Sequence, residues 1–528
     1  MTTPISGTGV VTKQGNGMVY IGSSTVTANA TVVQAGSLII GTEPALMSAV
    51  LPAASGPVVL NSDVFVQTYG TFGGDGTVTG NLTNEGNVLV GRSANGVDYG
   101  TLTVNGDYIG QGGNLTFDSV LAGDNSPTDK LVIAGDTSGT GTVAVNNIGG
   151  QGAQNTNGIE IISVGGTSAA TFTLNGRAVA GALEYFLYQG TTADPTNGNW
   201  YLRSNYVQPT YRPEAGGYIA NIAAANTLFN SRLEDMSASS TANGTDDMDT
   251  SLWLRQSISR NKFKDASGQL SNTSSRFVTQ LGGEVWDGQL TGKDYVGVGV
   301  MAGYARSTGT TDATSLTYKA DNSLTGYSIG VYGTWYQNAV KHNSPYVHTW
   351  LQYEWFEGSV NGDLLSSEKY HLRGVSMSVE GGYPFQVYQV ADNSGYITPQ
   401  AQLTLNGAKM SDLTEDNGTL VQQSGQNNLQ TRLGAKFSND TQLGADKAHP
   451  QILTSYLELN WIHNTRLAGV TMDGMEMQQT GSRHLVEVKL GVEGKVNNNL
   501  SVWGSLTNQI GQQSYDDKAA MLGVRYKF

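Results

Sequence analysis

The sequence has 528 residues, of which 69 are glycine and 14% are charged, and its net charge is −14. So few charges exclude a disordered acidic tail, and the lack of any basic run excludes nucleic acid as a partner. There are no cysteines, which excludes a disulfide framework and suits a long chain that crosses an oxidising compartment unfolded, with chance composition as the alternative.

The first residues, MTTPISGTGV, have neither the basic nor the apolar region of a secretory signal. The chain is therefore either cytoplasmic or has lost a leader, and we expect the second because Met1 stands directly on a repeat-like segment. No stretch approaches the 18 or so consecutive apolar residues of a membrane-spanning helix, so we expect none.

Residues 1–210 are rich in Gly, Thr, Asn and Val. Short alternating phrases such as GTVTGNLTNEGNVLVG return about every 20 residues and are broken by Gly or Asn turns. This pattern predicts a solenoid, most simply a right-handed parallel β-helix over residues 1–169, with a small β-sandwich as the alternative. We expect four apolar residues of the first coils to point inward: Val26, Val32, Leu38 and Ile40.

A helix is predicted within residues 211–249, in YRPEAGGYIANIAAANTLFNSRLEDM. Pro213 suits the first turn, Glu214 suits the positive end, and alanines fill the middle, so we expect a helix from Pro213 to Leu233. Polar residues on several sides fit a narrow, wet tube better than a hydrophobic core, with a surface connector as the alternative. These polar residues are Asn221, Asn226, Asn230, Arg232 and Glu234.

Residues 250–528 contain twelve alternating segments, from SLWLRQSIS to AAMLGVRYKF. Membrane-crossing strands need about 9–11 residues each, joined by turns and by longer polar loops, as here. Seven of the eight tryptophans lie in this half, most of them near a strand end, where aromatic girdles meet lipid headgroups. The other strand face carries Gly, Gln, Ser, Arg and Glu. We therefore predict an all-β chain that ends in a 12-stranded transmembrane β-barrel with the α-helix in a polar lumen.

The last segment keeps its strand pattern to the final residue, because Leu522, Val524, Tyr526 and Phe528 are apolar at every second position. A closed barrel has no free edge. The last strand is therefore expected to run to its end in order to pair with the first.

Several stretches resemble the classical monomeric autotransporters of Gram-negative bacteria, the AIDA/IcsA-like adhesin group in particular. The barrel half carries YRPEAGGYIANIAAANTLF, SLWLRQSISRNKFKDASGQLSNTSSRFVTQLGGEVW and the terminal VRYKF. Upstream, GTLTVNGDYIGQGGNLTFDSVLAGDNSPTDKLVIAGD resembles the pertactin-like end of a passenger. Within residues 170–210, LEYFLYQGTTADPTNGNWYLRS resembles the autochaperone segment that caps the β-helix, with Phe186, Trp200 and Tyr201 as its core.

The resemblance implies an outer-membrane barrel that secretes its own passenger and anchors it on the cell surface as an adhesin for a host-surface ligand. It also implies outer-membrane lipid, periplasmic chaperones and the barrel-assembly machinery as partners, a monomeric barrel and no cofactor. The family's terminal assembly signal is matched by Gly523, Tyr526 and Phe528, whereas Met521 stands where the family often has a polar residue.

We expect no catalytic or metal site. All six histidines lie after residue 340, which excludes a Ser/His/Asp protease in the N-terminal half, and they lack metal-ligand spacing. GGDGTVTGN and GDNSPTDK are interpreted as solenoid turns and not as metal sites. Gly330 and Tyr332 are interpreted as barrel packing, since a glycine can receive an aromatic ring from the next strand.

Self-cleavage in the linker is the remaining chemical hypothesis. The linker lacks the Asn-Asn pair of the cyclising autotransporters, although Glu234 with Asp235 could serve another branch of the family. We expect instead that these residues hydrogen-bond to the barrel wall. The alternative function is a porin-like outer-membrane barrel with an N-terminal binding module that is not exported. The helix and the solenoid argue against it, because porins lack both.

Overall fold

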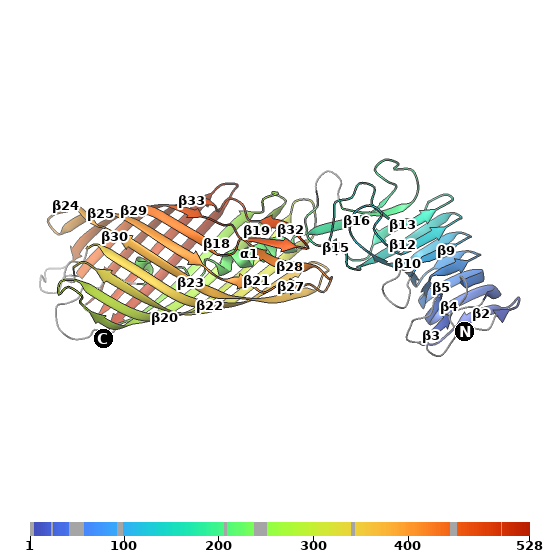
Figure 1. The fold of residues 1–528 in the computed structure, drawn as a ribbon, viewed down its shortest axis with the longest axis horizontal. Coiled ribbons are helices and arrows are strands. Elements are labelled where there is room, and N and C mark those ends of the chain that lie inside the picture. The colour runs from blue at the N-terminus through green and yellow to red at the C-terminus, as the bar shows by residue number, and fades with distance from the viewer. Residues whose placement is uncertain are drawn as a thin grey trace. The chain divides into compact units, whose positions relative to one another are not determined.

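The computed structural model describes residues 5–22, 25–41, 58–91, 99–204, 209–236, 251–338, 344–443, 451–497 and 499–528. These residues form two units, one of residues 1–212 with 414–420 and one of residues 213–413 with 421–528. Both are built from strands (Figure 1). Within the described residues, no helix combines the length and the hydropathy needed to cross a bilayer.

In the first unit, neighbouring coils pair as parallel strands, as β4 does with β5 and β10 with β12, whereas β15, β16 and β17 pair antiparallel at the end of the stack. The strands are β1 (Ile5–Ser6), β2 (Val10–Lys13), β3 (Met18–Ile21), β4 (Val26–Ile40), β5 (Val58–Gly74), β6 (Gly76–Val78), β7 (Leu82–Asn84), β8 (Asn87–Val90), β9 (Thr101–Val104), β10 (Tyr108–Ser119), β11 (Lys130–Ile133), β12 (Thr137–Asn147), β13 (Ile159–Val164), β14 (Thr171–Leu174), β15 (Ala178–Ala180), β16 (Leu183–Gln189) and β17 (Trp200–Arg203).

The core of this unit is a stack of apolar side chains from successive coils. Val26, Leu38 and Ile40 are buried, as expected. The prediction for Val32 is wrong: Val33 is fully buried, and Val32 is only half-buried. The register of β4 against β5 shifts twice, and each shift interrupts the simple in-and-out alternation of side chains on which the prediction depended.

A ladder of four side chains links the turns of five successive coils. Each acceptor oxygen takes a hydrogen bond from the backbone N–H of the next rung: Asp63 from Asn81 at 2.8 Å, Asn81 from Asp107 at 2.8 Å, Asp107 from Asp136 at 2.8 Å, and Asp136 from Thr167 at 2.6 Å. The ladder ties one coil to the next where the chain turns and backbone groups would otherwise lack partners.

Every rung after the first is preceded by glycine. A Cβ on Gly106 would lie 2.4 Å from the Asn81 side chain, and Gly80, Gly135 and Gly166 meet the rung below in the same way. Gly-Asx dipeptides about one coil apart are therefore a spacing requirement of this ladder, which the sequence analysis did not recognise.

In the second unit, twelve long strands form an antiparallel barrel, as predicted. The barrel closes through β18 and β35, paired from Ser251 with Lys527 to Lys262 with Asp516. The long strands are β18 (Ser251–Lys264), β19 (Leu270–Gly288), β20 (Tyr295–Ala313), β21 (Lys319–Tyr336), β22 (Tyr346–Gly362), β23 (Ser367–Gly382), β25 (Asn393–Asn406), β29 (Asn428–Leu443), β30 (Gln451–Asn464), β33 (His484–Lys495), β34 (Leu500–Gly511) and β35 (Asp516–Lys527). Short strands are β24 (Phe385–Val390), β26 (Lys409–Met410), β27 (Leu413–Thr414), β28 (Leu420–Ser424), β31 (Gly469–Met472) and β32 (Met475–Gln478).

The barrel strands alternate between an apolar outward face and a polar inward face. On β22, Leu351 and Tyr353 are exposed outward, while Gln352 and Glu354 are buried inside. An aromatic ring also packs on a glycine in the barrel, but the glycine is not Gly330, the one named in the sequence analysis. The ring of Tyr332 packs against Gly299 on the neighbouring β20, and the indole N–H of Trp253 donates to its hydroxyl at 3.0 Å.

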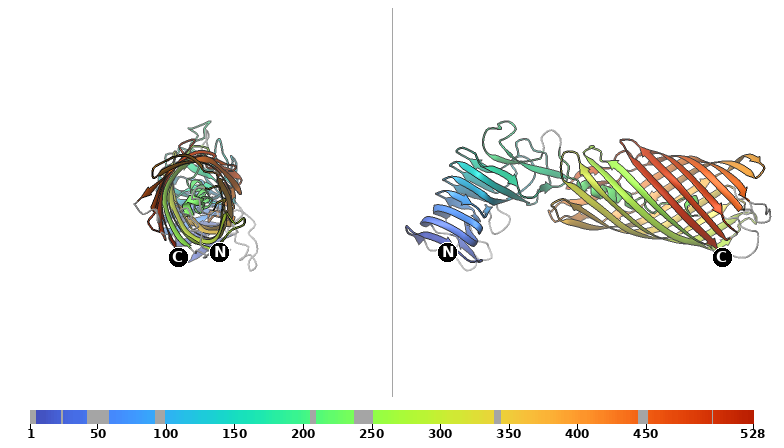
Figure 2. Two further views of the ribbon diagram at one scale, coloured as in Figure 1. Left: turned by 90° about the vertical axis from the view of Figure 1, so that its left-hand side faces the viewer. Right: turned by 180° about the vertical axis from the view of Figure 1, so that it is seen from behind.

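The helix α1 (Glu214–Ala225) lies inside the ring of strands, as Figure 2 shows in the view along the barrel. It begins directly after Pro213, as predicted, but it ends eight residues before Leu233, and the short α2 (Leu233–Met236) follows. The prediction of one helix to Leu233 is wrong: after α1 the chain forms turns, with the Asn230 N–H bonded to the Thr227 carbonyl, and the carbonyls of Phe229 and Ser231 are bonded to the barrel wall.

Candidate functional site

The site is the linker of residues 213–236 inside the barrel. All twelve residues of α1 are buried, which helix propensity alone does not dictate for a segment with Asn and Gly on several sides. Gly216 and Gly217 bring the helix close to the wall, since a Cβ on Gly216 would lie 2.5 Å from Thr311 and one on Gly217 would lie 3.2 Å from Val360.

Asn221 fixes the helix to three strands. Its amide nitrogen lies 2.8 Å from the hydroxyl of Tyr370 on β23, and 2.9 Å and 3.1 Å from the carbonyl oxygens of Ser323 on β21 and Ser359 on β22. Its oxygen accepts from Asn322 at 2.9 Å. The ring of Tyr218 also lies 5.4 Å from that of Tyr370. A buried amide with every polar atom paired specifies one position for the helix.

Beyond α1, the barrel side chains bind the backbone carbonyls of the linker directly. The Phe229 carbonyl accepts from Gln352 at 3.0 Å, and the Ser231 carbonyl accepts from Trp350 and Gln402, both at 3.0 Å. These bonds satisfy carbonyls that a continuous helix would satisfy internally, so the linker can leave the helical path between Phe229 and Ser231.

A network of ion pairs holds the end of the linker. Arg232 lies 2.8 Å from Glu487 and 3.4 Å from Glu458, and Lys489 lies 2.7 Å from Asp235 and 3.2 Å from Glu234. These groups are buried or nearly so. Removing one partner of such a pair leaves an uncompensated buried charge, which costs about 3–5 kcal/mol.

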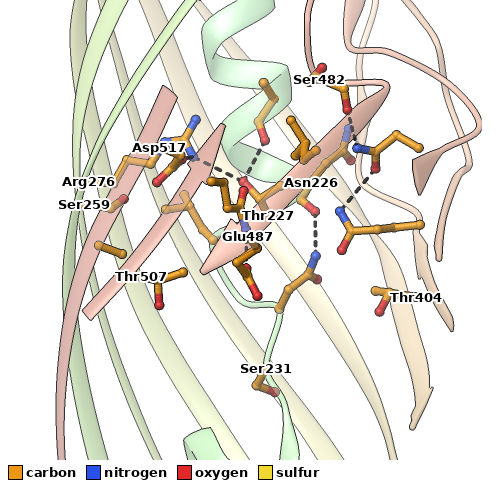
Figure 3. Close-up of a pocket in the computed structure, with 18 of the residues that line it drawn as sticks. Asn226, Thr227, Ser231, Ser259, Arg276, Thr404, Ser482, Glu487, Thr507 and Asp517 are labelled. Atoms are coloured by element: carbon orange, nitrogen blue, oxygen red, sulfur yellow. Dashed lines mark hydrogen bonds and ion pairs between the residues drawn. The ribbon is translucent and has the colours of Figure 1, made fainter. Parts of the chain in front are cut away.

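A polar cavity of about 240 Å³ remains beside the linker. Figure 3 shows Asn226 and Thr227 of the linker on one side, with Arg276, Glu487 and Asp517 from the strands around them. Arg276 and Asp517, which lie side by side in Figure 3, form an ion pair of 3.2 Å on the cavity wall. The linker and its partners therefore leave only a small, charged space in this part of the lumen.

Four of the linker groups that could take part in self-cleavage are engaged in polar contacts: Asn221, Asn230, Glu234 and Asp235. The amide of Asn221 is paired as described, and that of Asn230 donates to the carbonyl of Asn226 at 3.2 Å. Glu234 and Asp235 share Lys489. Among the residues that the structure describes, no group of three or more His, Cys, Asp or Glu side chains could hold a metal ion.

The residues expected to form the autochaperone core lie at the antiparallel end of the β-helix. Trp200 and Tyr201 are buried, whereas Phe186 is half-buried and its neighbour Tyr185 is fully buried. Trp200 continues an aromatic stack, with its ring 5.2 Å from that of Phe172. The interior position in β16 thus belongs to Tyr185 and not to Phe186.

Two side chains near this end, the buried Tyr185 and the half-buried Glu160, carry shifted pKa values. Burial raises the pKa of Tyr185 to about 12, and its hydroxyl lies 2.8 Å from the carbonyl oxygen of Ala153 and 3.0 Å from that of Ala122. Burial also raises the pKa of Glu160, but hydrogen bonds from Lys130, Tyr201 and Asn199 outweigh it, so that this pKa lies below its ordinary value.

The loop GDNSPTDK is structural. The carboxylate of Asp124 accepts hydrogen bonds from three successive backbone N–H groups, at Thr156, Asn157 and Gly158, at 2.7–3.1 Å. Such a nest of backbone donors binds an anion, and here the anion comes from the chain itself.

At the C-terminus, β35 is paired on both sides, with β34 and with β18. Tyr526 and Phe528 point outward, with ring centroids 5.1 Å apart, and both are exposed. Gly523 faces inward against the indole of Trp503, so that a side chain at this position would collide with it.

The functional residues that the sequence analysis missed lie on the barrel wall: Trp350, Gln352, Gln402, Glu458, Glu487 and Lys489. Their signal was present, because each is a polar or indole-bearing side chain at an inward position of an alternating strand. Which of them contact the linker depends on how the barrel closes, and alternation does not encode that.

Two family models match the chain. One, described as the autotransporter beta-domain, matches residues 252–507, and one described as autochaperone domain type 1 matches residues 77–187. The second match begins well before the segment that resembled an autochaperone in sequence.

Individual relatives match most of the chain. The uncharacterized protein YdeU of Escherichia coli K12 is 42% identical over 83% of this chain and 100% of its own length. The autotransporter adhesin AIDA-I of Escherichia coli is 39% identical over 81% of this chain, which spans about a third (34%) of AIDA-I. The crystal structure of the AIDA-I transport unit is similar with a TM-score of 0.54 and 36% identity, over 60% of this chain and 100% of that chain.

Proposed function

The chain belongs to the classical, AIDA-I-like autotransporters, and from this premise we propose that its barrel exports its own β-helix and anchors it on the cell surface, where it acts as an adhesin. The barrel lies in the outer membrane and the passenger is exposed at the surface.

The observation that carries the proposal is the linker inside the closed barrel. A segment held by carbonyl hydrogen bonds to Trp350, Gln352 and Gln402 and by ion pairs to Glu487 and Lys489 is the end point of a chain that has passed through the lumen. The ion pairs make the passage irreversible in practice, because leaving would strand several buried charges.

We infer that Phe528 and Tyr526 serve as the signal for the barrel-assembly machinery. Both rings point outward from the last strand, where a second protein can reach them before the barrel closes. Strand addition to a free sheet edge is a recurring mode of recognition. Gly523 has a different task in this proposal, since it makes room for Trp503.

The adhesin role is supported by the similarity to AIDA-I, whose name states that it is an adhesin. We propose that the β-helix binds a ligand on a host surface and that the chain is not an enzyme. The pairing of Glu234 and Asp235 with Lys489 supports a holding role for these carboxylates and not a cleaving one.

The test is protease shaving of intact cells that express the chain behind a secretory leader, with antibodies to each half. We expect the β-helix half to be digested while a barrel fragment from about residue 210 onward survives, because the bilayer protects paired strands. A chain in which Phe528 is replaced, Phe528→Ala, serves as the assembly control and should leave less protected barrel.

Protection of the β-helix until the outer membrane is broken would contradict export. It would favour the porin-like alternative with an internal binding module. That alternative also requires a steady open pore in planar bilayers, whereas a linker-filled lumen predicts a closed baseline with brief openings.

A further inference from the structure

The outward face of β18 changes abruptly from apolar to cationic. Leu252, Leu254 and Ile258 point outward along its first part, with Gln256 among them, and Ile258 is 61% exposed. The next three outward residues, at every second position, are Arg260, Lys262 and Lys264, and all three are exposed. No apolar or acidic residue stands between these three cations on the outward face of β18.

The neighbouring strand β19 lines this stripe with small hydroxyl side chains. Ser275 is paired with Arg260, Thr273 with Lys262 and Ser271 with Lys264. One step nearer to the apolar band, Phe277 is paired with Ile258. The cationic stripe of Arg260, Lys262 and Lys264 therefore has hydrogen-bond donors on both strands. The apolar side chains of Ile258 and Phe277 lie at one end of it.

On the other side of β18 lies the last strand of the barrel. Lys518 of β35 is paired directly with Arg260, and Asp516 is paired with Lys262. Lys518 also forms an exposed ion pair with Asp516 at 3.1 Å. Four cations and one carboxylate thus share the seam at which the barrel closes.

Like charges directly opposite each other on one face of a sheet destabilise the pairing. Arg260 and Lys518 stand in this relation on the seam. Within the described part of the chain, no hydrogen bond or ion pair joins the side chains of Arg260, Lys262 or Lys264 to another residue. An anion from outside the protein would remove the repulsion.

The orientation of the barrel places this stripe in the outer leaflet. Glu214, at the start of α1, contacts Gly362 at the end of β22. Strand pairing from β18 to β22 brings Lys264 and Gly362 to the same end of the barrel. The chain leads from this end to the β-helix, which is exposed on the cell surface.

We propose that Arg260, Lys262, Lys264 and Lys518 bind the phosphate of a phosphorylated lipid in the outer leaflet, and that this lipid stabilises the seam between the first and last strands. The four cations lie at the depth of the lipid headgroups, because the headgroups begin where the outward apolar band of the barrel ends. Arg and Lys donate charge-assisted hydrogen bonds to phosphate oxygens, and the hydroxyls of β19 add further donors. The acyl chains lie over Ile258, Phe277 and Leu522.

The experiment compares the full chain in a neutral detergent with and without added lipid A, and follows the temperature at which the folded band is lost in gel electrophoresis. We expect lipid A to raise this temperature for the wild type. The shift should fall by more than half in the double variant Arg260→Gln/Lys262→Gln. The double variant Lys293→Gln/Lys495→Gln removes the same charge at the other end of the barrel and should respond like the wild type.

The source of the phosphate is tested in parallel arms. Lipid A from which the phosphates have been removed, and inorganic phosphate at the same concentration, should both leave the temperature unchanged. An equal shift with inorganic phosphate would assign the stripe to a free ion and overturn the lipid proposal. If lipid A raised the temperature of Arg260→Gln/Lys262→Gln as much as that of the wild type, these two residues would not bind the lipid and the proposed site would be wrong.

A second measurement covers a variant that fails to fold. Native mass spectrometry of the single variants Arg260→Gln and Arg260→Lys counts the lipid A molecules retained per chain. Retention should fall in Arg260→Gln and survive in Arg260→Lys, which keeps the charge. Equal retention in both would contradict binding through this cation.

Discussion

Arg232 of the linker and Glu487 of β33 form an ion pair of 2.8 Å inside the barrel, although 255 residues separate them in sequence. Arg232 also forms an ion pair of 3.4 Å with Glu458, and this contact joins the linker to β30. Two acidic wall residues thus hold one basic residue of the linker inside the barrel.

Replacing Arg232 should therefore open the lumen. In Arg232→Ala, Glu487 and Glu458 lose their linker partner, and the seating of the linker weakens by about 3–5 kcal/mol. In planar bilayers we expect more frequent and longer openings than in the wild type. Arg483→Ala, at an exposed position, is the control and should stay closed. Equal opening in both variants would mean that Arg232 does not hold the plug.

Gly299 should not tolerate a side chain, because the ring of Tyr332 occupies that space. In Gly299→Ala the ring must move and the 3.0 Å hydrogen bond from Trp253 is lost, at a cost of about 1–3 kcal/mol. The heat-induced loss of the folded band should occur at a lower temperature. Gly333→Ala is the matched control, since its nearest atom is 3.8 Å away. A similar loss in both would exclude packing on glycine as the cause.

In the turn ladder, we expect the hydrogen-bond acceptor of each side chain to matter more for the stability of the β-helix than its charge. Asp107→Ala leaves the N–H of Asp136 without its 2.8 Å partner and should lower the unfolding free energy of the β-helix by about 1 kcal/mol. Asp107→Asn keeps an acceptor, as Asn81 does one coil earlier, and should stay close to the wild type. The urea midpoint of the β-helix measures both. A loss in Asp107→Asn as large as in Asp107→Ala would show that charge dominates.

Glu160 makes the stability of the β-helix depend on pH. Its pKa in the folded state is lowered from the ordinary 4.5, so its contribution is fully present above that value and is lost as the pH falls through the folded pKa. The stability difference between the wild type and Glu160→Gln should shrink between about pH 6 and about pH 3.

The measurement is the urea midpoint of the β-helix from the fluorescence of Trp200, the one tryptophan before residue 210, in urea that leaves the barrel folded. Glu85→Gln, at an exposed position, is the control for removing one carboxylate from the β-helix. A pH-independent difference for Glu160→Gln would contradict the shifted pKa.

The sequence by itself determined the fold class, the order of solenoid, helix and barrel, the twelve strands and the start of α1 directly after Pro213. These features follow from local patterns: a period of two along each strand, turn residues at coil spacing, and proline before an alanine-rich run. Inward and outward faces of the barrel follow from the same alternation.

Only the tertiary structure decided the end of α1, the burial of Val33 in place of Val32, and the ring of Tyr332 on Gly299. It also decided that Lys489 meets Asp235 and that Arg260 faces Lys518. The physical reason is that such contacts depend on register and on closure of the barrel, which join residues far apart in sequence, and no local period records which strand a side chain will face.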